Sequence, residues 1–519
     1  MAHNSEELHS LRHDEIKPEI VIGNGKSKQS IPLGDQRKAV LRQELMVFLI
    51  NLGILVGGMS LALPAVTLDQ LTNPAEPIHL DKSQSSWFAS ASSIACPVGS
   101  FSGVFLVDKI GRKKSILLVN LFAIIAWILM STAFYDNPSL VFLQLMISRM
   151  FSGLATGMGG SPASVYGAEV CLPKLRARLT MVASMAIAAG VLFAYVVGYF
   201  IRNDWRLIGM VYLVYQIICL ILLIPVKETP SWLLSKGRVK EAKASLSYFR
   251  GLDDGETHDE VEAEFALLRK TIPLKSKGIK KVSIWKSIRL PEVHKPLLLG
   301  VIFFAFQQFS GTFVVVVYAV QIITKAGVEA DPFLCAIYVG IARFVVASVV
   351  MTWQLEKWGR RPVSIFSAAT TSICLFLLAG PTWFPWLQIP TLSAAVIVGF
   401  VVSSAGLWTI PFLILPEIFP QKVRGSFCGI SIGCAYLLSF SSIKIFPSLM
   451  DWMGGNGNVF AFYGTMALLS IFFVYWFIPE TKGKTFLEIE DYFRRRKSTI
   501  HENDVEAKEC CVGVVPREV

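Results

Sequence analysis

The chain contains twelve apolar segments, each close to or longer than the roughly 18 residues that a helix needs to cross the hydrocarbon core of a bilayer. They lie at approximately 46–66, 86–107, 116–134, 141–164, 179–200, 207–226, 295–321, 332–354, 363–381, 392–415, 427–449 and 458–478. Inside lipid a segment must satisfy its own backbone N–H and C=O groups, and a helix of this length does so. The sequence therefore predicts an all-α polytopic membrane protein with twelve transmembrane helices.

Composition supports this class and excludes a soluble one. Of the 519 residues, 53% are hydrophobic and only 17% are charged, and the mean hydropathy is +0.53. One soluble core cannot hide that much apolar surface. We attribute the net charge of +11 to membrane topology and to attraction toward anionic lipid, so we expect the bilayer as a partner and no nucleic acid.

The short loops between the segments carry unequal positive charge. One alternate set contains Lys109, Arg112, Lys113, Lys114, Lys174, Arg176, Arg178, Lys357, Arg360, Arg361, Lys422 and Arg424, and the other contains only Lys82, Arg202, Arg206 and Lys325. Basic loops stay in the cytoplasm. We therefore expect both termini and segment 227–294 to be cytoplasmic, with the first helix as an uncleaved insertion signal. We expect an integral membrane protein of the plasma membrane.

The nine cysteines do not indicate a disulfide framework, because seven of them lie in or beside the apolar segments. Cys510 and Cys511 are adjacent in the C-terminal tail. They are either acylated or idle reduced thiols.

Two motifs repeat at one spacing. "DKIGRKK" begins at Asp108 and "EKWGRRP" at Glu356, and 356 − 108 = 248. Glu169 and Arg176 return as Glu417 and Arg424 with the same offset of 248. Two motifs in one register predict two homologous six-helix halves. We divide the chain into an N-terminal tail (1–44), a first half (45–226), a linker (227–294), a second half (295–478) and a C-terminal tail (479–519).

The repeated charges suggest a conformational latch. A carboxylate at a helix end, a tight glycine turn and a guanidinium group can form charge-assisted bonds across the cytoplasmic face, holding the halves together in one state and releasing them in another. The alternative is that the basic loops only fix topology and the acids are solvated. The predicted latch consists of Asp108, Arg112, Glu169, Arg176, Glu356, Arg360, Glu417 and Arg424.

Further motifs are spread over nearly the whole chain. They include "YGAEVCLPKLR", "KETPSWLLSKGR", "QQFSG", "PEIFPQKVRG" and "PETKG". The chain resembles the sugar porters of the major facilitator superfamily, in particular animal facilitative glucose transporters and insect trehalose transporters. The resemblance implies short cytoplasmic helices between the halves, and the apolar spacing of "GRVKEAKASLSYFRG" and "DEVEAEFALLRK" is typical of such helices.

Two adjacent glutamines interrupt the apolar stretch "FFAFQQFSGTFVVVVY". A buried amide costs several kcal/mol without a partner, so Gln307 and Gln308 must face a cavity or another helix. The resemblance implies that they line the central cavity and bond sugar hydroxyls. The alternative is that they join two packed helices.

The remaining pocket positions implied by the resemblance hold fewer amides than the family pattern. Phe313 stands where an asparagine is usual, Ser184 where a glutamine is usual, and Phe412 where a tryptophan is usual; Tyr318 keeps one position of an aromatic pair. Each lost bond to a buried hydroxyl weakens binding by about 0.5–1.5 kcal/mol. The implied substrate-binding residues are Ser184, Gln307, Gln308, Phe313, Tyr318 and Phe412.

We expect facilitated diffusion of a sugar, a hexose or trehalose, by alternating access, because the first segment holds no acid that a proton-driven porter would titrate. We expect a monomer without enzymatic activity, metal or cofactor. The alternatives are a sugar-sensing receptor that does not transport, and a porter for a less polar or anionic solute. Arg343, inside the eighth segment, either binds such an anion or pairs with a neighbouring carbonyl or polar group.

Overall fold

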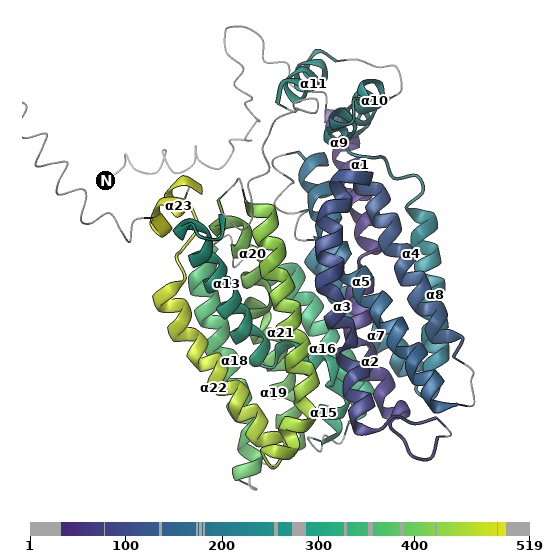
Figure 1. Cartoon of the computed structure of the whole chain (residues 1–519), viewed down its shortest axis with the longest axis vertical. Helices are drawn as coiled ribbons and strands as arrows, with labels where there is room; N and C mark the ends of the chain where they lie inside the picture. Colours follow the sequence, from purple (N-terminus) through teal and green to yellow (C-terminus); the bar gives the residue numbers. More distant parts are fainter. Residues whose placement is uncertain are drawn as a thin grey trace, which may run out of the picture.

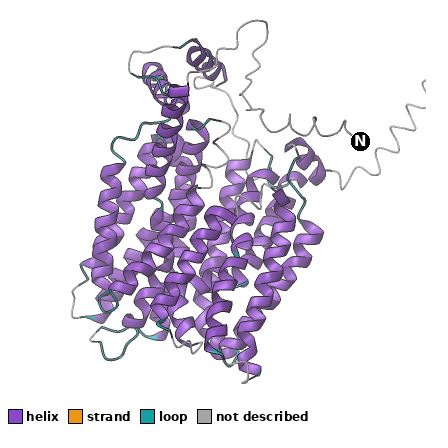
Figure 2. Ribbon diagram, turned by 180° about the vertical axis from the view of Figure 1, so that it is seen from behind, coloured by secondary structure: helices purple, strands orange, loops and turns teal. Residues whose placement is uncertain are grey.

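A computed structural model gives the conformation of residues 33–76, 78–133, 137–172, 175, 179, 182–253, 258–271, 287–325, 330–350, 357–384, 389–420, 423–484 and 486–494. Within these residues the regular structure is entirely helical (Figure 2). Seven cysteines lie among them, and no disulfide bond joins those seven. Cys510 and Cys511 lie outside the described residues.

The first half consists of α1 (Leu33–Leu52), α2 (Leu55–Leu71), α3 (Lys82–Ile110), α4 (Arg112–Ser131), α5 (Pro138–Val170), α7 (Val182–Phe200) and α8 (Trp205–Leu222). The second half consists of α13 (Pro291–Phe309), α14 (Thr312–Val317), α15 (Ala319–Lys325), α16 (Pro332–Val345), the π-helix η2 (Val346–Val350), α18 (Arg360–Trp383), α19 (Pro390–Ser403), α20 (Ala405–Ile418), α21 (Arg424–Trp452) and α22 (Asn456–Phe477). The shorter helices α9 (Pro230–Ser235), α10 (Val239–Phe249) and α11 (Asp259–Thr271) follow the first half, and α23 (Phe486–Arg494) follows the second.

Ten of the described helices are long and apolar enough to cross a membrane. The eighth expected span adds α16, which is shorter, and the seventh adds α13 to α15, which is broken. Each of the twelve expected spans is therefore helical over most of its described residues, although the seventh is not the continuous helix that its hydropathy suggests. Its first break lies at Gly311, where φ is +76° and an added Cβ would lie 2.6 Å from the ring of Tyr463.

The halves lie side by side, with the early helices on one side and the late helices on the other (Figure 1). Contacts between α3 and α21, between α7 and α16, and between α2 and α14 join them. We call the end that carries α9 to α11 and α23 the linker end, and the opposite end, beside α15, the far end (Figure 1).

The linker helices pack on the first half. Gln43 of α1 donates to the carbonyl of Phe249 at 2.8 Å and accepts from the backbone N–H of Leu172 at 3.0 Å. The Tyr166 hydroxyl donates to the carbonyl of Lys227 at 2.8 Å. The contacts of Gln43 hold the part of α1 that precedes residue 46, where the apolar segment begins.

Candidate functional site

A polar cluster fixes the linker end of the first half. Arg112 at the start of α4 donates to Glu169 at the end of α5, with an Nη2–Oε1 distance of 2.6 Å. The other oxygen of Glu169 accepts from the Thr229 hydroxyl at 2.6 Å. Glu228 accepts from the backbone N–H groups of Arg112 and Lys113, each at 3.1 Å. We call Arg112, Glu169, Glu228 and Thr229 the first cluster.

The second half repeats this arrangement bond for bond. Arg360 Nη2 lies 2.7 Å from Glu417 Oε1, and the Thr481 hydroxyl donates to the other Glu417 oxygen at 2.5 Å. Glu480 accepts from the backbone N–H groups of Arg360 and Arg361 at 3.1 and 3.0 Å. We call Arg360, Glu417, Glu480 and Thr481 the second cluster.

A glycine turn gives each cluster the space it needs. Gly111 and Gly359 have φ values of +102° and +89°, a region in which side chains are strained. A Cβ on Gly111 would lie 2.3 Å from Glu228, and one on Gly359 would lie 2.9 Å from Glu480. The glycine of the repeated "GR" motif thus serves both the turn and the carboxylate beneath it.

The two equivalent carboxylates differ in pKa. Burial raises the pKa of Glu228, although N–H groups of Thr229, Arg112 and Lys113 act against it. Burial also acts to raise the pKa of Glu480, but backbone donors, including those of Lys482 and Arg360, lower it below its ordinary value. Glu228 therefore takes up a proton at a higher pH than Glu480 does.

Four members of the predicted latch meet in these clusters, but each bond lies within one half. Asp108 is 82% exposed and lies 3.5 Å from Arg112, and Arg424 contacts the carbonyl of Phe419 at 3.4 Å. Arg176 and Glu356 lie outside the described residues. A bond of the latch across the halves stays a prediction.

The two glutamines of the seventh span are buried, with exposed fractions of 0% for Gln307 and 1% for Gln308. Gln307 Nε2 donates to the carbonyls of Leu407 and Trp408 in α20, at 2.9 and 2.8 Å. Gln307 Oε1 accepts from Gln308 Nε2 at 3.2 Å. Gln308 Oε1 is buried without a donor. The pair joins two helices in this conformation, and its contact with a solute stays a prediction.

A proline explains why Gln307 turns toward α20. In an unbroken helix the carbonyl of Leu407 would accept from the N–H of residue 411, four positions later. That residue is Pro411, which has no N–H. The amide of Gln307 therefore supplies the donor that α20 lacks.

Next to the glutamine pair lies an aromatic stack. The rings of Phe313 and Trp408 are nearly parallel, at an angle of 13°, with centroids 3.8 Å apart. Arg343 Cζ lies 3.5 Å from the centroid of the same Trp408 ring. The stack brings α14, α16 and α20 together. The three residues that form it are far apart in the sequence.

The other expected substrate contacts are dispersed. Phe412 is half-buried and packs edge-on against Phe304, with centroids 4.9 Å apart. Tyr318 is buried, and its hydroxyl contacts the carbonyl of Ile443 at 3.3 Å. Ser184 is exposed and is the third residue of α7. The structure thus places Phe313 beside Gln307 through Trp408, but it does not gather all six expected residues around one cavity.

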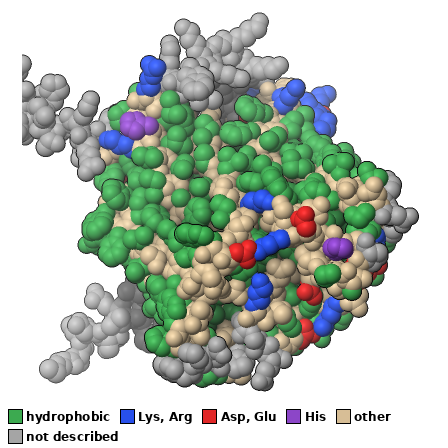
Figure 3. All heavy atoms as spheres, turned by 60° about the horizontal axis from the view of Figure 1, so that its bottom comes forward, with side chains coloured by type: hydrophobic (Ala, Val, Ile, Leu, Met, Phe, Trp, Pro, Cys, Tyr) green, Lys and Arg blue, Asp and Glu red, His purple; other side chains and the backbone are tan. Residues whose placement is uncertain are grey.

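Polar contacts join the two halves at the far end. Lys82 of α3 pairs with Asp451 of α21, and Arg202 pairs with Asp331. Lys444 Nζ donates to the Ser86 hydroxyl at 2.7 Å. Charged side chains gather in the middle of this end, whereas apolar side chains cover its flanks (Figure 3). Within the described residues, no ion pair joins the halves at the linker end.

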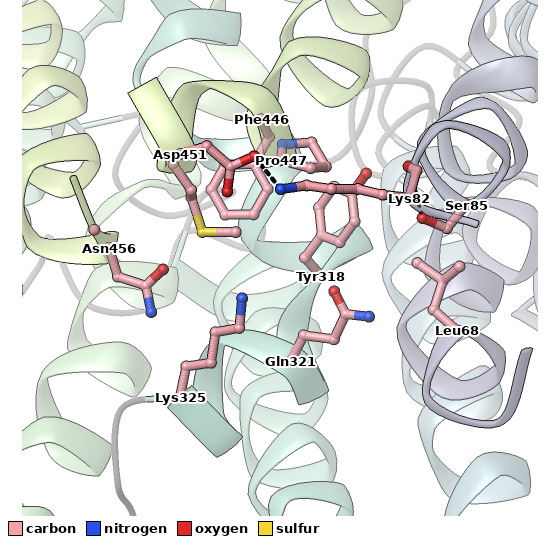
Figure 4. A pocket seen from close by; sticks show the side chains of 12 residues that line it. Leu68, Lys82, Ser85, Tyr318, Gln321, Lys325, Phe446, Pro447, Asp451 and Asn456 are labelled. Carbon is pink, nitrogen blue, oxygen red and sulfur yellow. Dashed lines mark hydrogen bonds and ion pairs between the residues drawn. The ribbon is translucent and has the colours of Figure 1, made fainter. Parts of the chain in front are cut away.

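A pocket of about 300 Å³ opens beside the Lys82–Asp451 pair. Figure 4 shows Tyr318 next to this pair, Gln321 and Lys325 on the α15 side of the pocket, and Asn456 on another segment. The pocket is lined by residues of both halves, so a movement of one half against the other must change its shape.

Sequence reasoning missed part of this site. The Glu-Thr pairs of both clusters stand in "KETP" and "PETK", directly after the sixth and twelfth spans, and this shared dipeptide was the available signal. Trp408 carried no such signal, because its role depends on the contacts of three helices.

Comparisons with known proteins agree with this architecture. Residues 39–493 match the family model described as "Sugar (and other) transporter". The chain is 27% identical over 462 residues to a facilitated trehalose transporter of Polypedilum vanderplanki, covering 87% of this chain and 88% of the relative. It is 28% identical over 459 residues to the Drosophila pseudoobscura pseudoobscura protein of that description, covering 86% of this chain but only 51% of that longer relative.

Solved structures show the same fold. The inward-open conformation of the xylose transporter XylE from E. coli superposes with a TM-score of 0.71 at 24% identity, covering 86% of this chain and 98% of that one. The proton:xylose symporter XylE bound to 6-bromo-6-deoxy-D-glucose gives a TM-score of 0.69 at 23% identity, covering 88% and 99%.

Proposed function

The chain belongs to the sugar (and other) transporter family of the major facilitator superfamily, and we propose that it moves a sugar, a hexose or trehalose, by facilitated diffusion. The facilitated trehalose transporters among its relatives support the sugar class. The proposal includes the implied solute contacts at the centre of the bundle, with Gln307 and Gln308 first among them.

The observation that carries the mechanism is the doubled cluster at the linker end. Each half ties the ends of its own helices together through an arginine, a glutamate and a Glu-Thr pair, so each half can move as one body. The ion pairs between halves lie at the far end. Rocking of rigid halves about a central solute site is the mechanism of alternating access.

The expected topology gives this conformation a direction. With the basic loops inside, the linker end faces the cytoplasm and the far end faces outward. The bonds at the far end then close the outer side, and this structure is the inward-facing state. In the outward-facing state we expect the two clusters to approach each other, as the latch requires.

The coupling follows from the first helix. Described residues 46–66 contain no Asp, Glu or His, and a proton-driven porter needs a titratable group within the membrane. We therefore propose a uniporter of the plasma membrane with cytoplasmic termini. The two clusters argue against a receptor that does not transport. They make each half rigid, and rigid halves are what alternating access requires.

Uptake by proteoliposomes that contain only this protein tests the proposal. We expect saturable uptake of labelled glucose or trehalose that stops when the inside and outside concentrations are equal. Accumulation beyond that point under an imposed pH gradient, abolished by a protonophore, would overturn uniport. Specific binding without any uptake would favour the receptor.

A further inference from the structure

Arg343 lies inside the bundle at the junction of the two halves. Gly340, one turn earlier in α16, packs so closely on α7 that an added Cβ would lie 3.0 Å from Tyr195. Tyr195 belongs to the first half, and its hydroxyl donates to the carbonyl of Val316 in α14 at 2.9 Å. The guanidinium therefore lies beside the contact between the halves, and in the proposed alternating access a solute moves between those halves.

Trp408 separates Arg343 from Phe313. Both groups lie over the Trp408 ring, the guanidinium carbon at 3.5 Å and the phenyl centroid at 3.8 Å. Two groups at these distances would collide if they shared one face of the ring, so they occupy opposite faces. Trp408 thus presents the guanidinium from a rigid aromatic support.

The guanidinium has no polar partner within the described residues. Arg343 is only 9% exposed, its Nε is buried without an acceptor, and it takes part in no ion pair with a described acid. Its guanidinium lies over the face of Trp408.

Arg149 provides an internal comparison. It is also buried, with an exposed fraction of 1% against 9% for Arg343, but its nitrogens all donate hydrogen bonds. Nε donates to the carbonyl of Phe88, Nη1 to that of Ser60, and Nη2 to the hydroxyl of Ser92. The bundle therefore can satisfy a buried arginine, and at Arg343 it does not.

A buried cation without a partner is costly, and a planar guanidinium matches a carboxylate through two parallel hydrogen bonds. We propose that Arg343, supported by Trp408, binds the carboxylate of a sugar acid. This inference rests on the proposed transport function and narrows its substrate class. Gln308 Oε1, which lacks a donor, offers an acceptor for a hydroxyl of the sugar.

Glucose and glucuronate are the matched probes, because they differ only in the group at C6, a neutral hydroxymethyl or a carboxylate. Uptake first shows which of the two sugars the protein transports, and that sugar is then used as the labelled ligand. The affinity of the purified full chain for each unlabelled sugar is measured by its competition with this ligand. We expect the wild type to bind glucuronate about tenfold more tightly than glucose, the difference between a charge-assisted and a neutral hydrogen bond. Arg343→Gln should abolish this preference, and Arg343→Lys, which keeps the charge but not the fork, should retain part of it.

Lys325→Gln is the matched control, since it removes a cation that lines the far-end pocket and should leave the preference unchanged. Melting temperatures establish that each variant is folded. If Arg343→Gln does not fold, the inference is tested by two results: the preference of the wild type for glucuronate and the reduced preference expected of Arg343→Lys. Equal affinities for the two probes, or a preference that survives Arg343→Gln, would overturn the inference.

Two further arms separate the causes of failure. Uptake of glucose without any binding of glucuronate overturns the sugar-acid site and leaves the proposed function intact, whereas uptake of glucuronate alone overturns neutral-sugar transport and supports the site. Addition of sodium chloride tests whether Arg343 binds an inorganic anion instead of a carboxylate. Stabilisation by chloride that needs Arg343, with no competition from glucuronate, would replace the sugar acid with a halide.

Discussion

Replacing Gln307 with leucine tests the interpretation that this amide repairs α20. The substitution keeps a similar volume but removes two donors, so the carbonyls of Leu407 and Trp408 both lose a hydrogen bond. At a net 0.5–1.5 kcal/mol for each bond, we expect a loss of about 1–3 kcal/mol in the free energy of unfolding. Reversible unfolding in mixed micelles measures this loss.

A second substitution makes the test specific. Pro411→Ala restores the N–H that an unbroken α20 would direct at Leu407, so Gln307→Leu should cost about 1 kcal/mol less in that background. Pro416→Ala, which changes another proline of the same helix, is the control and should show no coupling. An equal loss of stability from Gln307→Leu in the wild type, in Pro411→Ala and in Pro416→Ala would refute the reasoning. Solute binding would then be the remaining role proposed for Gln307.

Three further predictions concern the clusters and the stack. Glu417→Gln should slow turnover several-fold, with half-saturation unchanged, in uptake corrected for surface delivery; an unchanged rate would leave the charges with topology only. Because the pKa of Glu228 is raised and that of Glu480 is lowered, acidifying the linker side should neutralise Glu228 first and reduce the transport rate. This dependence of the rate on pH should be absent in Glu228→Gln and present in Glu480→Gln. Phe313→Asn should strengthen hexose binding several-fold while losing about 0.5–1.5 kcal/mol of stacking on Trp408; an unaltered affinity would make Phe313 a packing residue.

Patterns that depend on one helix or one repeat could be predicted from the sequence. The offset of 248 residues pairs Arg112 with Arg360 and Glu169 with Glu417, and both Arg–Glu bonds form in the structure. Hydropathy located twelve segments, and the described part of each contains helix. Breaks within spans were less visible, because Gly311 is one small residue in an apolar run and the ring of Tyr463 that packs on it belongs to another helix.

Contacts that depend on how helices cross could not be predicted in this way. Gln307, Trp408 and Arg343 belong to three different spans, and no periodicity relates them. Pro411 did offer a usable rule, since a proline inside a span always leaves the carbonyl four residues earlier without its usual donor. A glutamine in another span is then a natural candidate to satisfy it.

The Glu-Thr pairs have a consequence for synthesis on the ribosome. Glu228 and Thr229 follow α8, so the bonds around Arg112 and Glu169 can form only after the chain has been made past its sixth span. The smallest piece that completes the first cluster is thus the first six spans and the next few residues, rather than the six spans alone. A nascent chain that stalls at Leu222 would leave Glu169 with only one of its two partners, whereas one released after α11 would hold a finished half before the second half has emerged.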